Sequence, residues 1–241
     1  MSESFNLKEF FHDTFKSLRK RELFLWIGSM IIVTAANIIS SFITGDFNIL
    51  TLAAALIGVT SLIFAAKGHL FGPLFMVFFS ILYGIISLHF RYWGEMITYL
   101  GMTLPMSVWA LIAWYKHPSE QNKNEVKIAS LGPVKISVTV ILTAFVTVGF
   151  YFILKFFNTP NLIFSTISIA TSFAAAALTL LRSPYYALLY AANDIVLIIL
   201  WLLASFENPT YISVIVNFAI FLINDSYGFI SWMKRKKYSA Q

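Results

Sequence analysis

Two acidic side chains lie inside long apolar stretches of the sequence, where an ionisable group is least expected. Asp194 lies near the middle of one stretch, and Asp225 lies in the next one along the chain. A charged side chain at the centre of a bilayer costs at least about 2.5–3.5 kcal/mol on insertion scales, so such residues are candidates for function. No lysine or arginine lies deep in any apolar stretch. A path with acids and no fixed cations favours a neutral or positively charged solute and should reject phosphate and free carboxylate groups.

Amide and aromatic side chains recur near these acids at helical spacing, so each set shares one face of its helix. Aromatic faces stack a flat ring and attract a cationic one, and amides and carboxylates hold ribose-type hydroxyl groups. The predicted substrate-binding residues are Tyr190, Asn193, Asp194 and Trp201 on one face, Asn217, Phe221, Asn224 and Asp225 on the next helix, and Tyr83, Tyr99 and Met102 in earlier segments.

Each of these residues also has a structural interpretation. An asparagine in a membrane span more often bonds a neighbouring helix than a ligand. Tryptophans near the ends of spans are typical of interfacial anchors. For Asp225 a role in function and a structural role, paired with a tyrosine hydroxyl or a backbone amide, are equally favoured. For Asp194 a role in function is favoured over a structural one. Gly101 and Pro105 are expected to kink their span and provide a hinge.

The composition places these segments in a membrane. Of 241 residues, 59% are apolar and 12% are charged, with a mean hydropathy of +0.77. Soluble domains contain about 45–50% apolar and about 25% charged residues. The chain has no cysteine, its four histidines are scattered, and it has no phosphate-binding GxxxxGK[ST] loop. We therefore expect no metal site, no cofactor, no ATP-driven pumping and no enzymatic activity.

Runs of about 20 apolar residues predict an all-α membrane protein with eight transmembrane helices. The predicted spans are residues 23–43, 48–66, 70–90, 93–115, 136–157, 161–181, 184–204 and 209–232. Residues 1–22 form an amphipathic segment, 116–135 a polar loop and 233–241 a basic tail. With eight spans, 15 of the 17 basic residues fall on the side that holds both termini. Because cytoplasmic loops collect Lys and Arg, both termini are predicted to be cytoplasmic, and the net charge of +6 does not indicate nucleic-acid binding.

An internal repeat relates the two halves of the chain. The segment that ends in Trp114-Tyr115-Lys116 resembles the one that ends in Trp232-Met233-Lys234, and the same offset pairs Tyr83 with Trp201. Residues 48–115 and 161–232 thus form two three-helix repeats, joined by a linking helix over 136–157, with 23–43 as an extra N-terminal helix. An odd number of linking spans makes the repeats parallel, which is a transporter architecture with its site at the interface of the repeats.

Three motifs of the sequence resemble those of the PnuC family of bacterial nicotinamide riboside transporters. This family is distantly similar to the SWEET sugar transporters. The resemblance rests on Trp93-Gly94-Glu95-Met96, on Ser183-Pro184-Tyr185-Tyr186 leading to Asn193-Asp194, and on the stretch from Asn217 to Trp232. A WxxWxxN pattern found in some members reads Ala187, Tyr190 and Asn193 here. This departure leaves open which vitamin or nucleoside is carried, since related transporters are assigned to thiamine, riboflavin or deoxynucleosides.

The resemblance implies a homotrimer in the bacterial inner membrane that takes up nicotinamide riboside by facilitated diffusion with alternating access. Intracellular phosphorylation would then trap the substrate. The flat cationic ring and the ribose of nicotinamide riboside suit the aromatic, amide and acidic helix faces predicted above. Nicotinamide mononucleotide would instead place a phosphate group beside the acids. The alternatives are proton-coupled transport with Asp194 or Asp225 as the carrier, or transport of another vitamin or nucleoside.

Overall fold

The computed structural model describes residues 14–45, 49–89, 93–120, 122–206 and 211–238. Most of the predicted N-terminal amphipathic segment, residues 1–13, lies outside the described residues. Within them, eight helical segments are long and apolar enough to cross a membrane, so the predicted all-α fold with eight spans is confirmed. The helices are α2 (Lys20–Thr44), α3 (Ile49–Lys67), α4 (Phe71–His89), α5 (Trp93–Ile97), the π-helix η1 (Thr98–Thr103), α6 (Leu104–Lys116), α7 (Pro133–Phe156), α8 (Leu162–Leu180), α9 (Tyr185–Ser205) and α10 (Ile212–Tyr238).

The helix boundaries follow from local chemistry. Pro133 opens α7 at a position where its missing N–H has no helical partner to lose. Gly45 ends α2 in the left-handed conformation, at φ 71°. The last helix extends past the predicted end at residue 232, because Arg235, Lys236 and Lys237 are good helix formers that also complement the negative end of the helix dipole.

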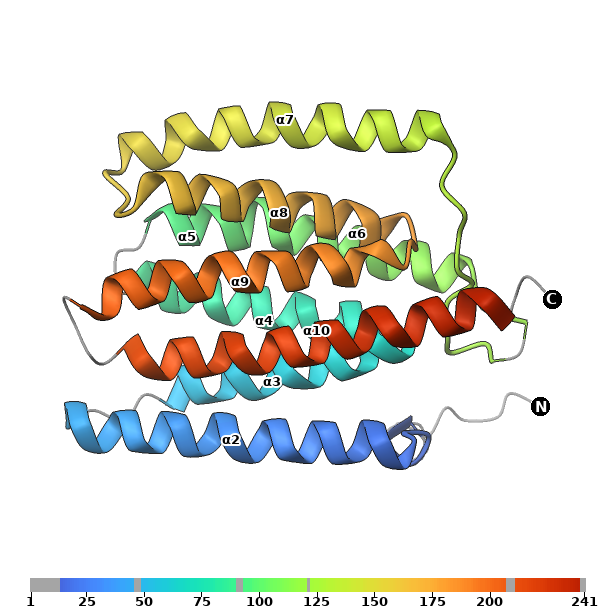
Figure 1. Cartoon of the computed structure of the whole chain (residues 1–241), viewed down its shortest axis with the longest axis horizontal. Coiled ribbons are helices and arrows are strands. Elements are labelled where there is room, and N and C mark those ends of the chain that lie inside the picture. Colours follow the sequence, from blue (N-terminus) through green and yellow to red (C-terminus); the bar gives the residue numbers. More distant parts are fainter. Residues whose placement is uncertain (1–13, 46–48, 90–92, 121, 207–210, 239–241) are drawn as a thin grey trace, which may run out of the picture.

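Six spans pack in a closed ring. Along the ring, α3 contacts α4, α4 contacts the span formed by α5, η1 and α6, and α6 contacts α8; α8 then contacts α9, α9 contacts α10, and α10 returns to α3. The start of α2 and the end of α10 lie at the same end of the bundle, which we call the termini end; the opposite end is the far end (Figure 1). A cavity at the centre of this ring would therefore be enclosed by all six spans.

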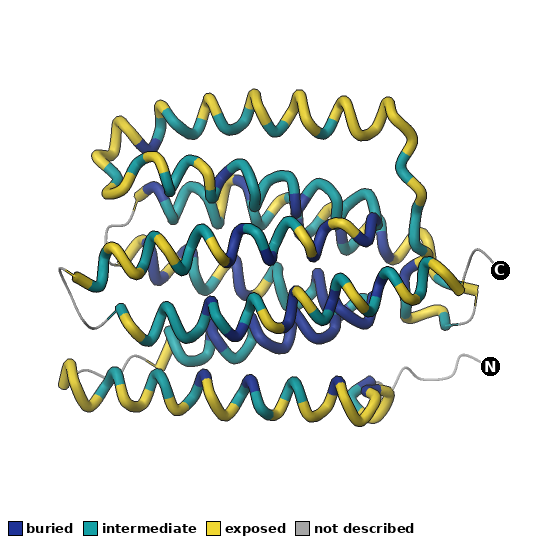
Figure 2. Tube along the Cα trace, in the orientation of Figure 1, coloured by how far each residue is buried: buried dark blue, intermediate teal, exposed yellow. Residues whose placement is uncertain are grey.

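Of the described helices, two lie outside the ring. α7 packs on α8, and α2 packs on α3 and α10. The Nε1 atom of Trp26 in α2 donates a hydrogen bond to the hydroxyl of Thr60 in α3 at 3.1 Å. Exposed residues cover most of α7 and the outer face of α2 (Figure 2). The exposed side chains of α7 include Val140, Ile141 and Phe145, as expected for surface that faces lipid.

The packing order supports the predicted repeat. The last helix of each predicted repeat contacts the first helix of the other, α10 on α3 and α6 on α8. At each of these contacts a buried tryptophan donates its Nε1 hydrogen to a backbone carbonyl, Trp114 to Thr179 at 2.9 Å and Trp232 to Ala65 at 2.8 Å. The sequence comparison places Trp114 and Trp232 at equivalent positions, so the two bonds are reciprocal.

Candidate functional site

A cavity of about 550 Å³ lies inside the ring of helices. Every span of the ring contributes to its wall, and the α7–α8 turn adds Phe157, Thr159 and Asn161 at the far end. On α9 the lining residues extend from Tyr190 to Ala204, and on α10 they extend from Phe218 to Asp225, with Tyr211 just before that helix. The cavity therefore runs from the far end of the bundle to about mid-depth, where Asp194 and Asp225 lie.

The π-helix η1 forms one wall of this cavity. Pro105 lacks an N–H, so it cannot bond the carbonyl four residues earlier, and the chain widens to longer-range bonding just before it. The N–H of Leu104 bonds the carbonyl of Tyr99, and the Thr103 hydroxyl bonds the carbonyl of Thr98 at 3.2 Å. Such π-turns are frequent at functional sites. The expected hinge near Gly101 and Pro105 is thus a change of helical register that presents Thr98, Tyr99 and Thr103 to the cavity.

Among the residues that the structure describes, acids are the only fully charged side chains in the cavity wall. Glu95, Asp194 and Asp225 line it, and no lysine, arginine or histidine does so among the described residues. Glu95 lies toward the far end, in the first turn of its span, while Asp194 and Asp225 lie deeper. This distribution gives the path a negative character from its mouth to mid-depth, as the sequence predicts.

The two deep acids touch each other. The carboxyl groups of Asp194 and Asp225 lie within hydrogen-bonding reach across the α9–α10 contact. Both residues are only 4% exposed. In the described part of the chain, no N–H or O–H group donates to the Oδ2 atom of Asp194. The site therefore holds carboxyl oxygens that a bound solute can satisfy.

Asn193 is held in place by α8. Its Oδ1 atom accepts hydrogen bonds from the hydroxyls of Ser168 at 3.0 Å and Thr171 at 2.8 Å. With the oxygen satisfied, the amide NH₂ group is the part of the side chain that remains to face the cavity. Two fixed N–H donors beside two carboxyl groups suit a ligand with both hydroxyl and carbonyl oxygens.

Aromatic rings line the opposite wall. The rings of Tyr83 and Tyr99 lie 4.5 Å apart, and Phe79 packs within 5.8 Å of Tyr99. Toward the far end, Trp201 and Tyr211 lie 5.1 Å apart. These rings offer flat apolar surfaces and electron-rich faces to a solute that enters the cavity.

Comparisons with known proteins agree with this geometry. Residues 48–234 match the family described as "Nicotinamide mononucleotide transporter". The chain belongs to this family. It is 25% identical over 193 residues to the "Nicotinamide riboside transporter PnuC" of Neisseria mucosa, an alignment that covers 78% of this chain and 73% of the relative. It also shares the fold of a solved structure described as "Crystal structure of the Vitamin B3 transporter PnuC", with a TM-score of 0.77, 23% identity, and 95% of this chain and 97% of that chain covered.

Membership in this family confirms the prediction that the chain is a multi-pass membrane transporter and not an enzyme. It also confirms the resemblance stated from the sequence motifs. The family match begins at residue 48, so α2 lies before the matched region. The match to the solved structure covers 95% of this chain, so the role of α2 as an extra helix stays a prediction.

In this transporter, eight of the eleven residues predicted for the substrate site line the cavity: Tyr83, Tyr99, Tyr190, Asn193, Asp194, Trp201, Phe221 and Asp225. The other three do not. Met102 is buried against Leu154 and Ile169, because η1 turns it away from the face that carries Tyr99. Asn224 donates hydrogen bonds to the Ser29 hydroxyl at 3.0 Å and to the Ile220 carbonyl, so it links α10 to α2. Asn217 lies on α10 away from the cavity wall.

Small polar residues and further aromatics complete the wall, and they are absent from the predicted set. They include Ser165, Ser168, Ser172, Thr98, Thr103, Phe79, Trp93 and Tyr211, together with Glu95. Serines recur at 165, 168 and 172, which is helical spacing on α8, so this polar face is a signal that the sequence contains. The threonines of η1 are different, since only the π-turn brings both to the cavity.

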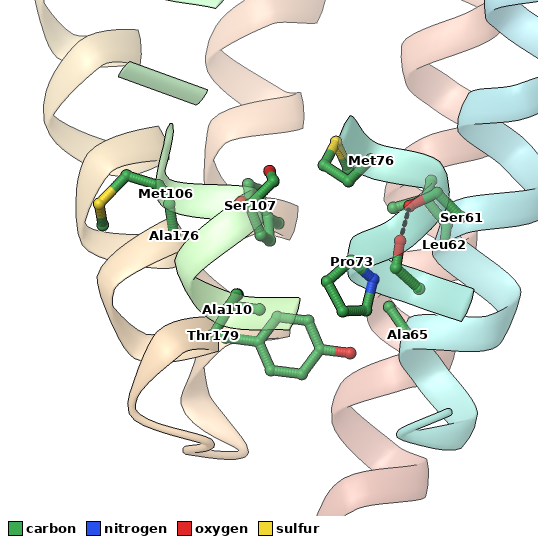
Figure 3. Close-up of a pocket in the computed structure, with 13 residues that line it drawn as sticks. Ser61, Leu62, Ala65, Pro73, Met76, Met106, Ser107, Ala110, Ala176 and Thr179 are labelled. Atoms are coloured by element: carbon green, nitrogen blue, oxygen red, sulfur yellow. Dashed lines mark hydrogen bonds between the residues drawn. The ribbon is translucent and has the colours of Figure 1, made fainter. Parts of the chain in front are cut away.

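The termini end of the ring is closed. The rings of Trp114 and Trp232 lie 5.5 Å apart, and Tyr186 packs edge-on against Trp232 at 5.0 Å. Val126 from the 117–132 loop joins this buried cluster. Between it and the main cavity lies a pocket of only about 30 Å³, bordered by Pro73 and Met76 on α4 and by Ser107 and Ala110 on α6 (Figure 3). The path through the ring is thus wide at the far end and blocked at the termini end.

Proposed function

We propose that this transporter carries nicotinamide riboside into the cell by facilitated diffusion. The observation that supports the proposal most directly is the cavity wall, with three acids and no basic residue among those described. Nicotinamide riboside has a flat, positively charged ring for the aromatic and acidic wall and a ribose for the Asn193 amide. The curated relative is named for the same substrate.

The family description names the mononucleotide instead, and the cavity argues against it for this chain. A phosphate group needs cationic or N–H-rich partners, and arginine or lysine normally supplies them. In this wall the phosphate would lie near Glu95, Asp194 or Asp225, at a repulsive cost that is large inside a protein. We therefore assign the riboside, and not its phosphate ester, as the substrate.

The charge distribution supports an orientation with the termini end in the cytoplasm of the bacterial cell and the protein in its inner membrane. Fifteen of the 17 basic residues belong to that side. The cavity then faces outward, toward the substrate that is to be taken up. Transport requires that the closed termini end opens while the far end closes, which is alternating access between the two repeats. Phosphorylation in the cytoplasm would prevent return of the substrate.

We also propose that the protein assembles as a homotrimer, as the family resemblance implies. The exposed apolar side chains of α7, including Val140, Ile141 and Phe145, supply surface that lipid or a neighbouring copy can cover. Native mass spectrometry of the detergent-solubilised protein tests this assignment. A predominant mass of a single chain across detergents would refute it.

Uptake into liposomes tests the transport proposal. Purified protein is reconstituted without ion gradients, and entry of labelled nicotinamide riboside is compared with entry of labelled mononucleotide. We expect saturable entry of the riboside only. The matched control is Tyr115→Phe, a residue 74% exposed on the outside of α6, which should transport like the wild type. Entry of the mononucleotide alone, or of neither compound, would refute the proposal.

The same vesicles separate the alternatives. Proton-coupled carriage predicts accumulation that collapses when an imposed pH gradient is removed, whereas facilitated diffusion predicts equilibration at any gradient. Thiamine is the other cationic candidate, because its ring is also flat and positively charged. A binding screen with nicotinamide riboside, its mononucleotide, thiamine and riboflavin identifies which compound the cavity prefers.

A further inference from the structure

The contact between Asp194 and Asp225 defines the charge that the cavity presents. Their carboxyl groups lie within hydrogen-bonding reach of each other, from adjacent helices at the deep end of the cavity. Oxygen atoms of two carboxylates have no hydrogen to place between them and repel strongly at this range. Two carboxyl groups so close cannot both ionise.

Among the described residues, neither a hydrogen-bond donor nor a basic side chain is placed to stabilise two negative charges on this pair. In the described part of the chain, no donor reaches the buried Oδ2 atom of Asp194, and no basic side chain lines the cavity. The charged and titratable neighbours are phenols and one acid. Tyr99 and Tyr190 lie near Asp194, Tyr186 and Tyr190 lie near Asp225, and Glu95 lies beyond Tyr99 toward the far end. Arg235 interacts with Tyr186 from the side of the termini end and does not line the cavity.

We propose that Asp194 and Asp225 share a single proton and act as one monovalent anionic site that selects singly charged cations. The shared proton bonds the two carboxyl groups to each other and leaves one negative charge on the pair. A cationic ring placed against the pair neutralises that charge. The proton stays on the pair throughout, so substrate binding takes up and releases no proton.

The proposal rests on the proposed function and makes it more specific. It assigns the substrate class as monovalent organic cations and states why the two acids do not couple transport to protons. A neutral analogue of the same shape, such as the dihydronicotinamide riboside, lacks the charge that balances the pair. It should bind less well than nicotinamide riboside to the wild-type protein.

Asparagine substitutions test the shared proton directly. In Asp194→Asn or Asp225→Asn, the amide N–H donates to the remaining carboxylate, as the shared proton does in the wild type, and the pair keeps one negative charge. We expect each single variant to bind nicotinamide riboside within about threefold of the wild type at pH 7, since the charge and the hydrogen bond are retained. The double variant has no charge, and we expect its affinity to fall about tenfold or more.

Calorimetry measures both quantities. Titrations of the wild type in two buffers with different ionisation enthalpies give the number of protons exchanged on binding, and we expect it to be zero. Thermal unfolding checks that each variant is folded, and the proton count needs no variant at all. Release of about one proton, a single Asn variant as weak as the double variant, or a double variant that binds like the wild type would each overturn the proposal.

Failure of this inference differs from failure of the proposed function. If wild-type protein binds no nicotinamide riboside, the substrate assignment is wrong. If wild-type protein binds it but exchanges a proton, or needs both carboxylates, the substrate assignment stands and the shared proton is wrong.

Discussion

The two ends of the helix ring differ in whether their buried polar groups have hydrogen-bond partners. At the termini end, buried donors meet acceptors: Trp114 and Trp232 bond backbone carbonyls, and the Ser61 hydroxyl donates to the Gly72 carbonyl at 2.8 Å. From mid-depth to the far end, the structure leaves polar atoms without partners. The buried side-chain atoms that lack a partner within the described residues belong to Ser87, Asp194, Asn217 and Asn224.

The termini end is also tied together by a basic side chain. Arg235 donates to the carbonyls of Lys67 at 2.8 Å and Val126 at 3.0 Å, and it lies 3.4 Å from Glu125. Lys67 in turn donates to the backbone carbonyl and the hydroxyl of Ser17. One cluster of contacts thus joins the N-terminal segment, the α3–α4 turn, the 117–132 loop and the last helix.

This difference in hydrogen bonding indicates that the termini end stabilises the fold and the far end binds the ligand. A buried polar group without a partner costs about 1–3 kcal/mol. Of the four residues with such an atom, Asp194 lines the cavity, where a bound ligand can satisfy it, whereas Ser87, Asn217 and Asn224 lie outside the cavity wall. Satisfied groups and aromatic packing stabilise the closed end. Under the alternating access proposed above, contacts at the closed end stabilise the outward-open state, and ligand binding at the open end provides the free energy that shifts the equilibrium.

Removal of a tryptophan should show the largest contrast between the ends. Trp232→Ala removes a side chain that is 0% exposed and leaves a cavity, so we expect a loss of about 3–5 kcal/mol in the free energy of unfolding. Trp201→Ala, in the cavity wall, is the matched control and should lose far less, because that ring already borders open space. Denaturant unfolding in detergent measures both. Equal losses would remove the contrast.

Two asparagines separate binding from stability. Asn193→Ala should weaken nicotinamide riboside binding by about 1–3 kcal/mol, because it removes amide donors from the cavity, and it should also lower stability, because the Ser168 and Thr171 hydroxyls lose their acceptor on α9. Asn224→Ala breaks the bond to Ser29 and should lower stability while leaving the dissociation constant unchanged. Calorimetry and thermal unfolding on both variants test the pair. Unchanged affinity in Asn193→Ala would make that residue structural.

These two residues also show what the sequence predicts well. Helical spacing brings Tyr190, Asn193, Asp194 and Trp201 to one cavity wall, because α9 is a regular helix. On α10 the same reasoning groups Asn224 with Phe221 and Asp225, yet Asn224 faces α2. A polar residue at the edge of a face is satisfied by whichever partner is nearer. The sequence alone does not indicate that α2 packs there.

The π-helix η1 is a second feature that helical spacing in the sequence does not predict. Spacing at i and i+3 predicts that Met102 shares the face of Tyr99, and this holds only in a regular α-helix. Pro105 is the visible cause of the irregular register, but it does not indicate which residues the wider turn presents. The eight spans are predictable because each is set by its own length and hydropathy. Contacts between helices depend on side chains far apart in the sequence.

The pH dependence of stability tests the closed end. Burial, with a smaller contribution from the nearby Lys67 charge, lowers the pKa of His69 to about 4, below its ordinary value of 6.5. The unfolded chain therefore takes up a proton first as the pH falls, so the stabilisation is complete above pH 6.5 and is lost as the pH falls from 6.5 toward 4. We expect the loss at pH 5 to reach about 2 kcal/mol relative to pH 7.5.

His69→Asn is the variant for this test. The His69 Nδ1 atom accepts a hydrogen bond from the N–H of Phe71 at 3.2 Å, and the asparagine oxygen offers an acceptor without titrating. Thermal unfolding at pH 5 and at pH 7.5 should show a smaller difference in the variant than in the wild type. The same pH sensitivity in both proteins would assign the effect to other groups.

The smallest expected effect compares two glutamates of one loop. Glu125 lies 3.4 Å from Arg235, and both side chains are 20% exposed, whereas Glu120 pairs with Lys127 at 2.6 Å with side chains 84% and 62% exposed. The shorter pair should matter less, because water screens an exposed pair and holding two mobile side chains costs entropy. Glu125→Gln should lower stability by about 1 kcal/mol, since it weakens the contact of a partly buried arginine that joins three segments. Glu120→Gln should leave the unfolding temperature unchanged in the same scanning experiment. If Glu120→Gln were the more damaging change, the loop would be held by its exposed edge, and the closure of the termini end would not depend on Arg235.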